Sequence, residues 1–204
     1  METKAAKRLV VGISGASGAS LAIELLNRMK LLRDWETHLV ISSGARKTIE
    51  QETIFSIDDV APLATRCYPL EDVGASIASG TFKTAGMVIV PCSMKTVAGV
   101  ASGFSQNLLL RAADVTLKER RKLVLVARES PLSQIHLRNL LTLAQMGAII
   151  LPPVLTYYNN PATIQDMANH IVGKIMDVFD IEMPGFQRWG VQSPNCEVRS
   201  MQGT

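Results

Sequence analysis

The chain has 204 residues, 47% of them hydrophobic, and a formal net charge of +3. This length and composition favour a single cytoplasmic domain over residues 1–204, with a core at about 9–190 and a tail at 191–204. No apolar run approaches the roughly eighteen residues of a membrane span, and the mixed-charge N-terminus is not a secretory signal. The three cysteines form no C-x-x-C pair and the charge is modest, so a disulfide framework, a zinc site and nucleic-acid binding are disfavoured.

The first apolar run, Leu9–Ile13, leads into a turn of Gly, Ala and Ser and then into amphipathic sequence. This pattern predicts a strand, a tight loop and a helix. Free N–H groups at the start of such a helix favour a phosphate, and the hydroxyls of Ser14 and Ser17 add donors. The glycine spacing matches neither a dinucleotide fingerprint nor a Walker A loop, so a close-packed turn without a ligand is the alternative.

The second predicted strand, 37–42, ends in Ser42-Ser43-Gly44 without an acidic residue at its tip. This counts against a dinucleotide and leaves room for a mononucleotide. His38 lies inside the strand and is interpreted as a packed histidine. Helical composition follows over 45–53, and the pattern over 56–84 is irregular, with a helix expected near 58–64 and a small-residue loop at 74–80.

The third predicted strand, 87–90, enters a second polar turn that contains Cys92. Without a nearby histidine, this thiol is interpreted as a half-buried strand-end residue, and a nucleophile is the alternative. Helical sequence over 107–118 ends in a basic cluster at 118–122, which is interpreted as a solvated helix end.

The fourth predicted strand, 123–126, is followed by Arg128 and Glu129, an arginine that can grip a phosphate and a carboxylate that can exchange protons. A plain surface ion pair is the alternative. Next come a predicted helix at 133–145 and a fifth strand at 148–151.

The last predicted helix has Asn160 as its N-cap and Pro161 at its first position. One apolar stripe, which includes Ile164, marks its core or interface face, and Lys174 lies off that stripe. Five strands alternating with helices predict a three-layer α/β domain with a central parallel sheet and a ligand at the carboxyl ends of the strands.

Several motifs together resemble the UbiX/Pad family of flavin prenyltransferases over about residues 9–190. They are Gly15-Ala16-Ser17-Gly18, Pro91-Cys92-Ser93, Arg111-Ala112-Ala113-Asp114-Val115, Leu117-Lys118-Glu119-Arg120, Arg128-Glu129-Ser130-Pro131-Leu132-Ser133, Ile135-His136-Leu137 and Arg188-Trp189. The resemblance implies a Rossmann-like or flavodoxin-like fold that binds reduced FMN. It also implies transfer of a dimethylallyl group from dimethylallyl phosphate to N5 and C6 of that flavin, giving prenylated FMN for a UbiD-type decarboxylase, often in a homododecamer.

The resemblance also assigns residue roles. FMN would be held by Gly15, Ala16, Ser17, Ser42, Ser93, Met94, Lys95, Thr96 and Arg128. Dimethylallyl phosphate would be bound by Arg111, Lys118, Tyr158 and Lys174, with Arg128 and Glu129 at the same phosphate. Ser17 and Glu52 would relay protons, with Glu129 as a further catalytic carboxylate, and no metal is expected.

Two departures from the family pattern affect whether the preferred prenyl donor is the monophosphate or the diphosphate. Lys174 stands where some relatives have arginine, and 73–77 lacks an aromatic residue that some members place against the prenyl group. Two other functions are considered. The first is an FMN-dependent cysteine decarboxylase, which would need a catalytic histidine near the first helix, where none stands. The second is a non-catalytic FMN-carrying subunit of a hydroxyarylic acid decarboxylase.

Overall fold

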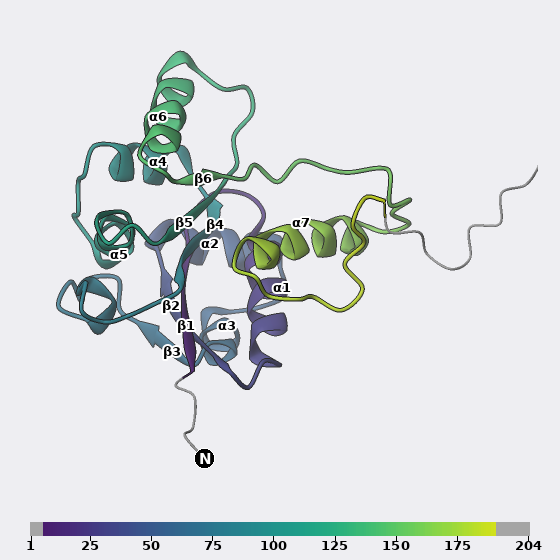
Figure 1. Ribbon diagram of the computed structural model, residues 1–204, viewed down its shortest axis with the longest axis horizontal. Coiled ribbons are helices and arrows are strands. Elements are labelled where there is room, and N and C mark those ends of the chain that lie inside the picture. The colour runs from purple at the N-terminus through teal and green to yellow at the C-terminus, as the bar shows by residue number, and fades with distance from the viewer. Residues whose placement is uncertain (1–5, 191–204) are drawn as a thin grey trace, which may run out of the picture.

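The computed structural model describes residues 6–190 and contains one six-stranded parallel sheet with helices on both faces (Figure 1). The strands are β1 (Lys7–Ile13), β2 (Trp35–Ile41), β3 (Arg66–Tyr68), β4 (Gly86–Cys92), β5 (Lys122–Ala127) and β6 (Ile149–Ile150). The α-helices are α1 (Ala19–Lys30), α2 (Ser43–Glu52), α3 (Ile57–Val60), α4 (Met94–Ala101), α5 (Leu108–Lys118), α6 (Gln134–Gln145) and α7 (Ile164–Val178). Short 3-10 helices lie at Ala61–Leu63 and Ser76–Ala78.

The strand order is β3-β2-β1-β4-β5-β6, and every pairing is parallel. The chain therefore reverses its direction of winding between β1 and β4, where Leu9 pairs with Gly86. At such a switch point the loops beyond the two strands diverge and leave a crevice for a ligand. The carboxyl edge of the sheet, where the sequence predicts the ligand, therefore includes the topological switch point.

Alternating side chains of the strands build one core on each face of the sheet. Leu9, Val11 and Ile13 of β1 pack with α1 and α7, whereas Val10 faces the opposite layer with α4 and α5. All four side chains are at most 2% exposed, because a parallel sheet is covered on both sides. The three-layer α/β prediction is confirmed.

Two element predictions need correction. The sheet has six strands rather than five, because 66–68 forms a short edge strand inside the segment that appears irregular in sequence. Three residues, of which Arg66 and Cys67 are exposed, are too few for a period-two pattern. The helix expected near 58–64 is split into α3 and a 3-10 turn, since Pro62 interrupts its ladder.

The start of α7 also differs from its prediction. Thr163 is the N-cap, its hydroxyl accepts from the N–H of Asp166, and the Asp166 carboxylate accepts from Thr163 in return. Asn160 instead has left-handed backbone (φ 48), and Ile164 of the expected apolar stripe is 86% exposed. The reciprocal capping box outweighs the Asn-Pro signal because it satisfies donors at both positions.

Candidate active site

The loops after β1 and β2 approach each other at two glycines. A Cβ on Gly15 would lie 2.9 Å from the Cα of Gly44, so backbone packs on backbone here. The Ser14 hydroxyl is buried, donates to the carbonyl of Pro91 at 2.9 Å and accepts from the N–H of Ser93 at 2.7 Å. Ser14 therefore joins the loops after β1 and β4, and its predicted role as a phosphate donor is wrong.

Glu52 lies at the N-terminus of α1, although 33 residues separate it from Ala19. Its carboxylate accepts the N–H of Gly18 at 2.8 Å and that of Ala19 at 3.0 Å. The anion predicted at this helix end is thus a side chain of the protein itself, and these two donors are not left for a phosphate. Gly18 has φ 110, a left-handed conformation that favours glycine where the chain enters α1.

The electrostatics of Glu52 favour its ionised form. Burial raises the pKa of the carboxyl group, but the nearby Ser17 hydroxyl, the N–H groups of Gly18 and Ala19 and the positive charge of Arg128 together hold the pKa below its ordinary value. Glu52 therefore accepts a proton more readily than it supplies one at neutral pH. Ser17 is exposed beside it, so these two predicted relay residues lie together with Arg128.

Two of the predicted FMN-binding serines cap helices at the same edge. Ser42 caps α2 by accepting from the N–H of Ala45, and Ser93 caps α4 by accepting from the N–H of Thr96. The Ser93 and Thr96 hydroxyls are also 3.1 Å apart. Between them Met94 is buried and Lys95 is exposed, so this turn offers a cation and hydroxyl groups above the switch point.

The end of β5 joins the same region. Arg128 is exposed, and its backbone N–H donates to the carbonyl of Cys92 at 3.0 Å. The carboxylate of Glu129, also exposed, accepts from the N–H of Ser130. Cys92 is completely buried, and burial raises the pKa of its thiol, so the nucleophile reading of this residue is wrong.

Tyr158 and Lys174 belong to a second group, around α7. The Tyr158 hydroxyl lies 3.4 Å from Nε2 of buried His170, and the two rings pack edge to face. Trp189 also packs against Tyr158, with the two ring planes nearly perpendicular and their centroids 5.1 Å apart. Burial, and then the charge of Lys174, lower the pKa of His170 and favour its neutral form. Nothing in the sequence singles out His170 except its position four residues before Lys174.

The other two residues predicted to bind the donor, Arg111 and Lys118, lie on α5. Arg111, in its first turn, pairs with Asp114 at 2.7 Å. Lys118 ends the helix at the amino edge of the sheet, directly before β5, whereas Arg128 follows the carboxyl end of that strand. The six residues of β5 separate the two edges by about 17 Å, more than a lysine side chain spans. One copy of the chain therefore does not bring Lys118 to Glu52 and Arg128.

Two other predictions concern residues outside these groups. His38 is 5% exposed, with Nδ1 2.8 Å from the Tyr68 hydroxyl, which confirms a packed histidine. The basic cluster at 118–122 is only partly a solvated helix end, because the Arg121 side chain is 16% exposed and is bound to a neighbouring loop. Among residues 6–190, no three His, Cys, Asp or Glu side chains are grouped to hold a metal ion.

Comparison with known proteins decides the family. The sequence matches the Flavoprotein family over residues 1–181. It is 54% identical to the flavin prenyltransferase LpdB of Lactiplantibacillus plantarum, over 90% of this chain and 98% of that protein. The chain belongs to the UbiX-like flavin prenyltransferases.

Solved structures agree with this family and with the flavodoxin-like fold. A dodecameric FMN-dependent UbiX-like decarboxylase from Escherichia coli O157:H7 superposes with a TM-score of 0.88 at 49% identity, over 89% of this chain and 98% of that one. AnUbiX (PadA1) in complex with FMN and dimethylallyl pyrophosphate gives a TM-score of 0.89 at 46% identity, over 92% and 100%. Within residues 6–190, none of the helices has the length and apolarity to cross a membrane.

Proposed function

We propose that this chain transfers a dimethylallyl group from dimethylallyl phosphate to N5 and C6 of reduced FMN, and that the prenylated FMN serves a UbiD-type decarboxylase. The observation that carries the proposal is the likeness to AnUbiX, which is 46% identical and binds FMN together with dimethylallyl pyrophosphate. The arrangement of Glu52, Ser17 and Arg128 at the switch point supports it.

The residues at the carboxyl edge fit FMN. Hydroxyl groups of Ser17, Ser42, Ser93 and Thr96 and the cations Lys95 and Arg128 gather there, and such donors suit a phosphate and a polar ring edge. The backbones of Gly15, Ala16 and Met94 complete this proposed set. When bound, reduced FMN supplies the two nucleophilic ring positions that accept the dimethylallyl group.

The cations and phenol bind the phosphate that leaves the donor. An allylic C–O bond breaks more easily when charge developing on the phosphate meets preorganised donors. Arg128 offers a planar fork, Lys174 and Arg111 offer further positive charge, and Tyr158 offers a hydroxyl that neutral His170 helps to orient. Glu129 lies beside Arg128 and handles a proton of the released phosphate.

Proton removal falls to Ser17 and Glu52. With FMN bound at this edge, the ionised Glu52 carboxylate would receive the proton that the flavin must lose, through the Ser17 hydroxyl beside it. The N–H groups of Gly18 and Ala19 keep Glu52 ionised and oriented. A glutamine at this position would keep the shape and lose the base.

Lys118 requires a second copy of the chain. Since it lies at the opposite edge of the sheet from Arg128, we propose that it binds the donor phosphate in the site of another protomer. A homododecamer like that of the Escherichia coli relative would supply such neighbours. Residues 1–204 would then act as one flavoprotein domain in a cytoplasmic assembly.

The test is anaerobic incubation with reduced FMN and dimethylallyl phosphate, then mass spectrometry of the extracted flavin. We expect a flavin heavier by one dimethylallyl unit, with the yield at least about a hundredfold lower for Glu52→Gln and reduced for Ser17→Ala. A flavin unmodified with both the monophosphate and the diphosphate would overturn the proposal. In that case, decarboxylation of a hydroxyarylic acid that occurs only with a partner subunit present would favour the carrier function. The Escherichia coli relative is described as a decarboxylase, so this activity is measured as well.

A further inference from the structure

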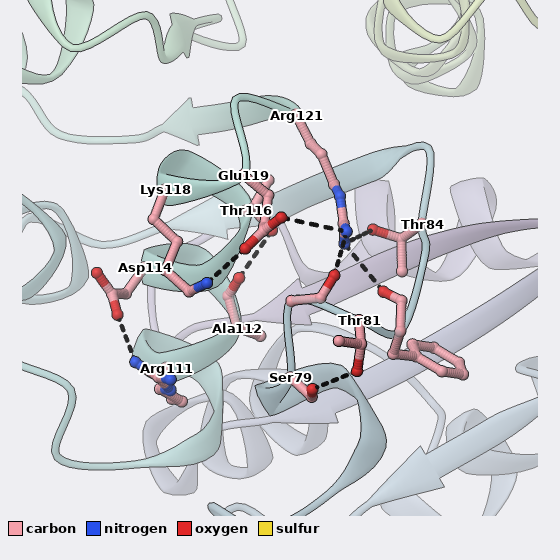
Figure 2. A network of polar contacts seen from close by, with 12 residues as sticks. Ser79, Thr81, Thr84, Arg111, Ala112, Asp114, Thr116, Lys118, Glu119 and Arg121 are labelled. Atoms are coloured by element: carbon pink, nitrogen blue, oxygen red, sulfur yellow. Dashed lines mark hydrogen bonds and ion pairs between the residues drawn. The ribbon is translucent and has the colours of Figure 1, made fainter.

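Arg121 is fixed to the segment that precedes β4. Its guanidinium donates to the carbonyls of Gly80 and Phe82, at 2.5 and 2.9 Å, and lies 3.4 Å from the Thr84 hydroxyl (Figure 2). Arg120 just before it has left-handed backbone (φ 55), which ends α5 and turns the chain toward this segment. With its side chain only 16% exposed, Arg121 is a rigid cation rather than a solvated one.

Glu119 links this rigid cation to Lys118. One oxygen of its carboxylate lies 2.5 Å from the Lys118 ammonium, and the other lies 3.9 Å from the Arg121 guanidinium (Figure 2). A lysine side chain has four rotatable bonds, so its ion pair with Glu119, whose other oxygen faces the guanidinium of Arg121, restricts its freedom. The ammonium has three donors, and one bond to Glu119 leaves two for phosphate oxygens.

Gly80 provides the space for this arrangement. A Cβ at residue 80 would overlap the Glu119 carboxyl group and lie 2.9 Å from the Lys118 ammonium. Its backbone is not left-handed, and the atoms in the way are the ends of flexible side chains, so an alanine at residue 80 would displace the Glu119 carboxylate and the Lys118 ammonium rather than strain the backbone.

We propose that Arg121 and Glu119, with the space that Gly80 leaves for them, are positioning residues that orient the Lys118 ammonium toward the phosphate of the prenyl donor. The inference rests on the proposed function, and it adds to it a preorganised cation that acts through a carboxylate bridge. Three charged side chains leave a net charge of +1, so the bridge orients Lys118 without cancelling the attraction for an anion. Preorganising the cation in the free protein lowers the entropy lost on donor binding.

The test measures steady-state prenylation by the full-length protein at varied dimethylallyl phosphate with saturating reduced FMN. Glu119→Gln should raise KM for the donor about tenfold while kcat changes less than about twofold, because a charged hydrogen bond is lost that positions the ground state. Gly80→Ala should do the same by displacing Glu119. FMN affinity, measured by fluorescence titration, should stay unchanged in both variants.

Controls separate positioning from general damage. Glu50→Gln is the matched control, because it makes the same change of charge at an exposed glutamate of α2, outside the residues proposed to bind FMN or the donor. On a Lys118→Met background, Glu119→Gln should add no further rise in KM, since it acts through Lys118. An unchanged donor KM in Glu119→Gln, or additive effects in the double variant, would overturn the inference while wild-type prenylation upholds the proposed function. Wild-type protein that forms no prenylated flavin would overturn both.

Discussion

At the scale of single residues, Glu52 carries the most information. Its carboxylate accepts two N–H groups at the start of α1, where the helix dipole favours a negative charge. The same bonds that position the proposed base also hold its pKa below the ordinary value of 4.5, so position and protonation state have one cause.

This coupling predicts a pH-dependent stability. Because folding lowers the pKa of Glu52, the ionised carboxylate stabilises the folded protein above pH 4.5, and that contribution is lost as the pH falls through the lowered value. Glu52→Gln should reduce the free energy of unfolding by about 0.3–1 kcal/mol at pH 7. Urea titrations between pH 7 and pH 3 measure the difference, with Glu50→Gln on the same helix as control. A deficit that grows toward acid pH would contradict the assignment.

At the scale of elements, the loops after β1 and β2 are held by direct backbone approach. A Cβ on Gly15 would lie 2.9 Å from Gly44, whereas a Cβ on Gly44 would lie 3.3 Å from Gly15. The two glycines therefore differ in how much the neighbouring loop must move to accept a methyl group.

The difference predicts a graded response. Gly15→Ala should destabilise the protein by roughly 1–3 kcal/mol and weaken FMN binding, because it pushes apart two loops of the proposed flavin site. Gly44→Ala should show a smaller loss of both. Chemical denaturation and fluorescence titration with FMN measure the two effects. Equal losses, or a larger one for Gly44→Ala, would show that the loop approach is not what requires glycine at residue 15.

At the scale of the whole molecule, the proposed site is divided. Glu52 and Arg128 lie at the carboxyl edge of the sheet, and Lys118 lies at the amino edge. If Lys118 binds the donor as proposed, this separation requires that a neighbouring copy complete the site, which a closed symmetric assembly would allow.

A complementation experiment checks the division. Glu52→Gln and Lys118→Met, each with much reduced but measurable activity alone, should regain activity when they are co-expressed with different tags and purified as mixed oligomers. In a random equal mixture about a quarter of the sites would have both wild-type residues, if a different copy provides each. Mixtures of a variant with itself are the control. No recovery in verified mixed oligomers would place Lys118 and Glu52 on the same copy.

The sequence by itself determined the parallel α/β fold and the family. Its apolar strand runs and its motifs are local patterns, and such patterns can be recognised without knowing which distant residues are in contact. The same reasoning located the carboxyl-edge loops, Ser17 and Arg128 among the proposed site residues. The tail at 191–204 and Cys196 lie outside the residues that the structure describes.

Only the tertiary structure decided what those residues contact. Ser14 looks like a ligand donor in sequence but joins two loops, and the anion at the start of α1 comes from Glu52, 33 residues beyond Ala19. Lys118 falls at the far edge of the sheet, and Arg121 binds a loop about 40 residues earlier. Each of these facts depends on contacts between residues distant in sequence, which strand order and helix packing create and which local periodicity does not encode.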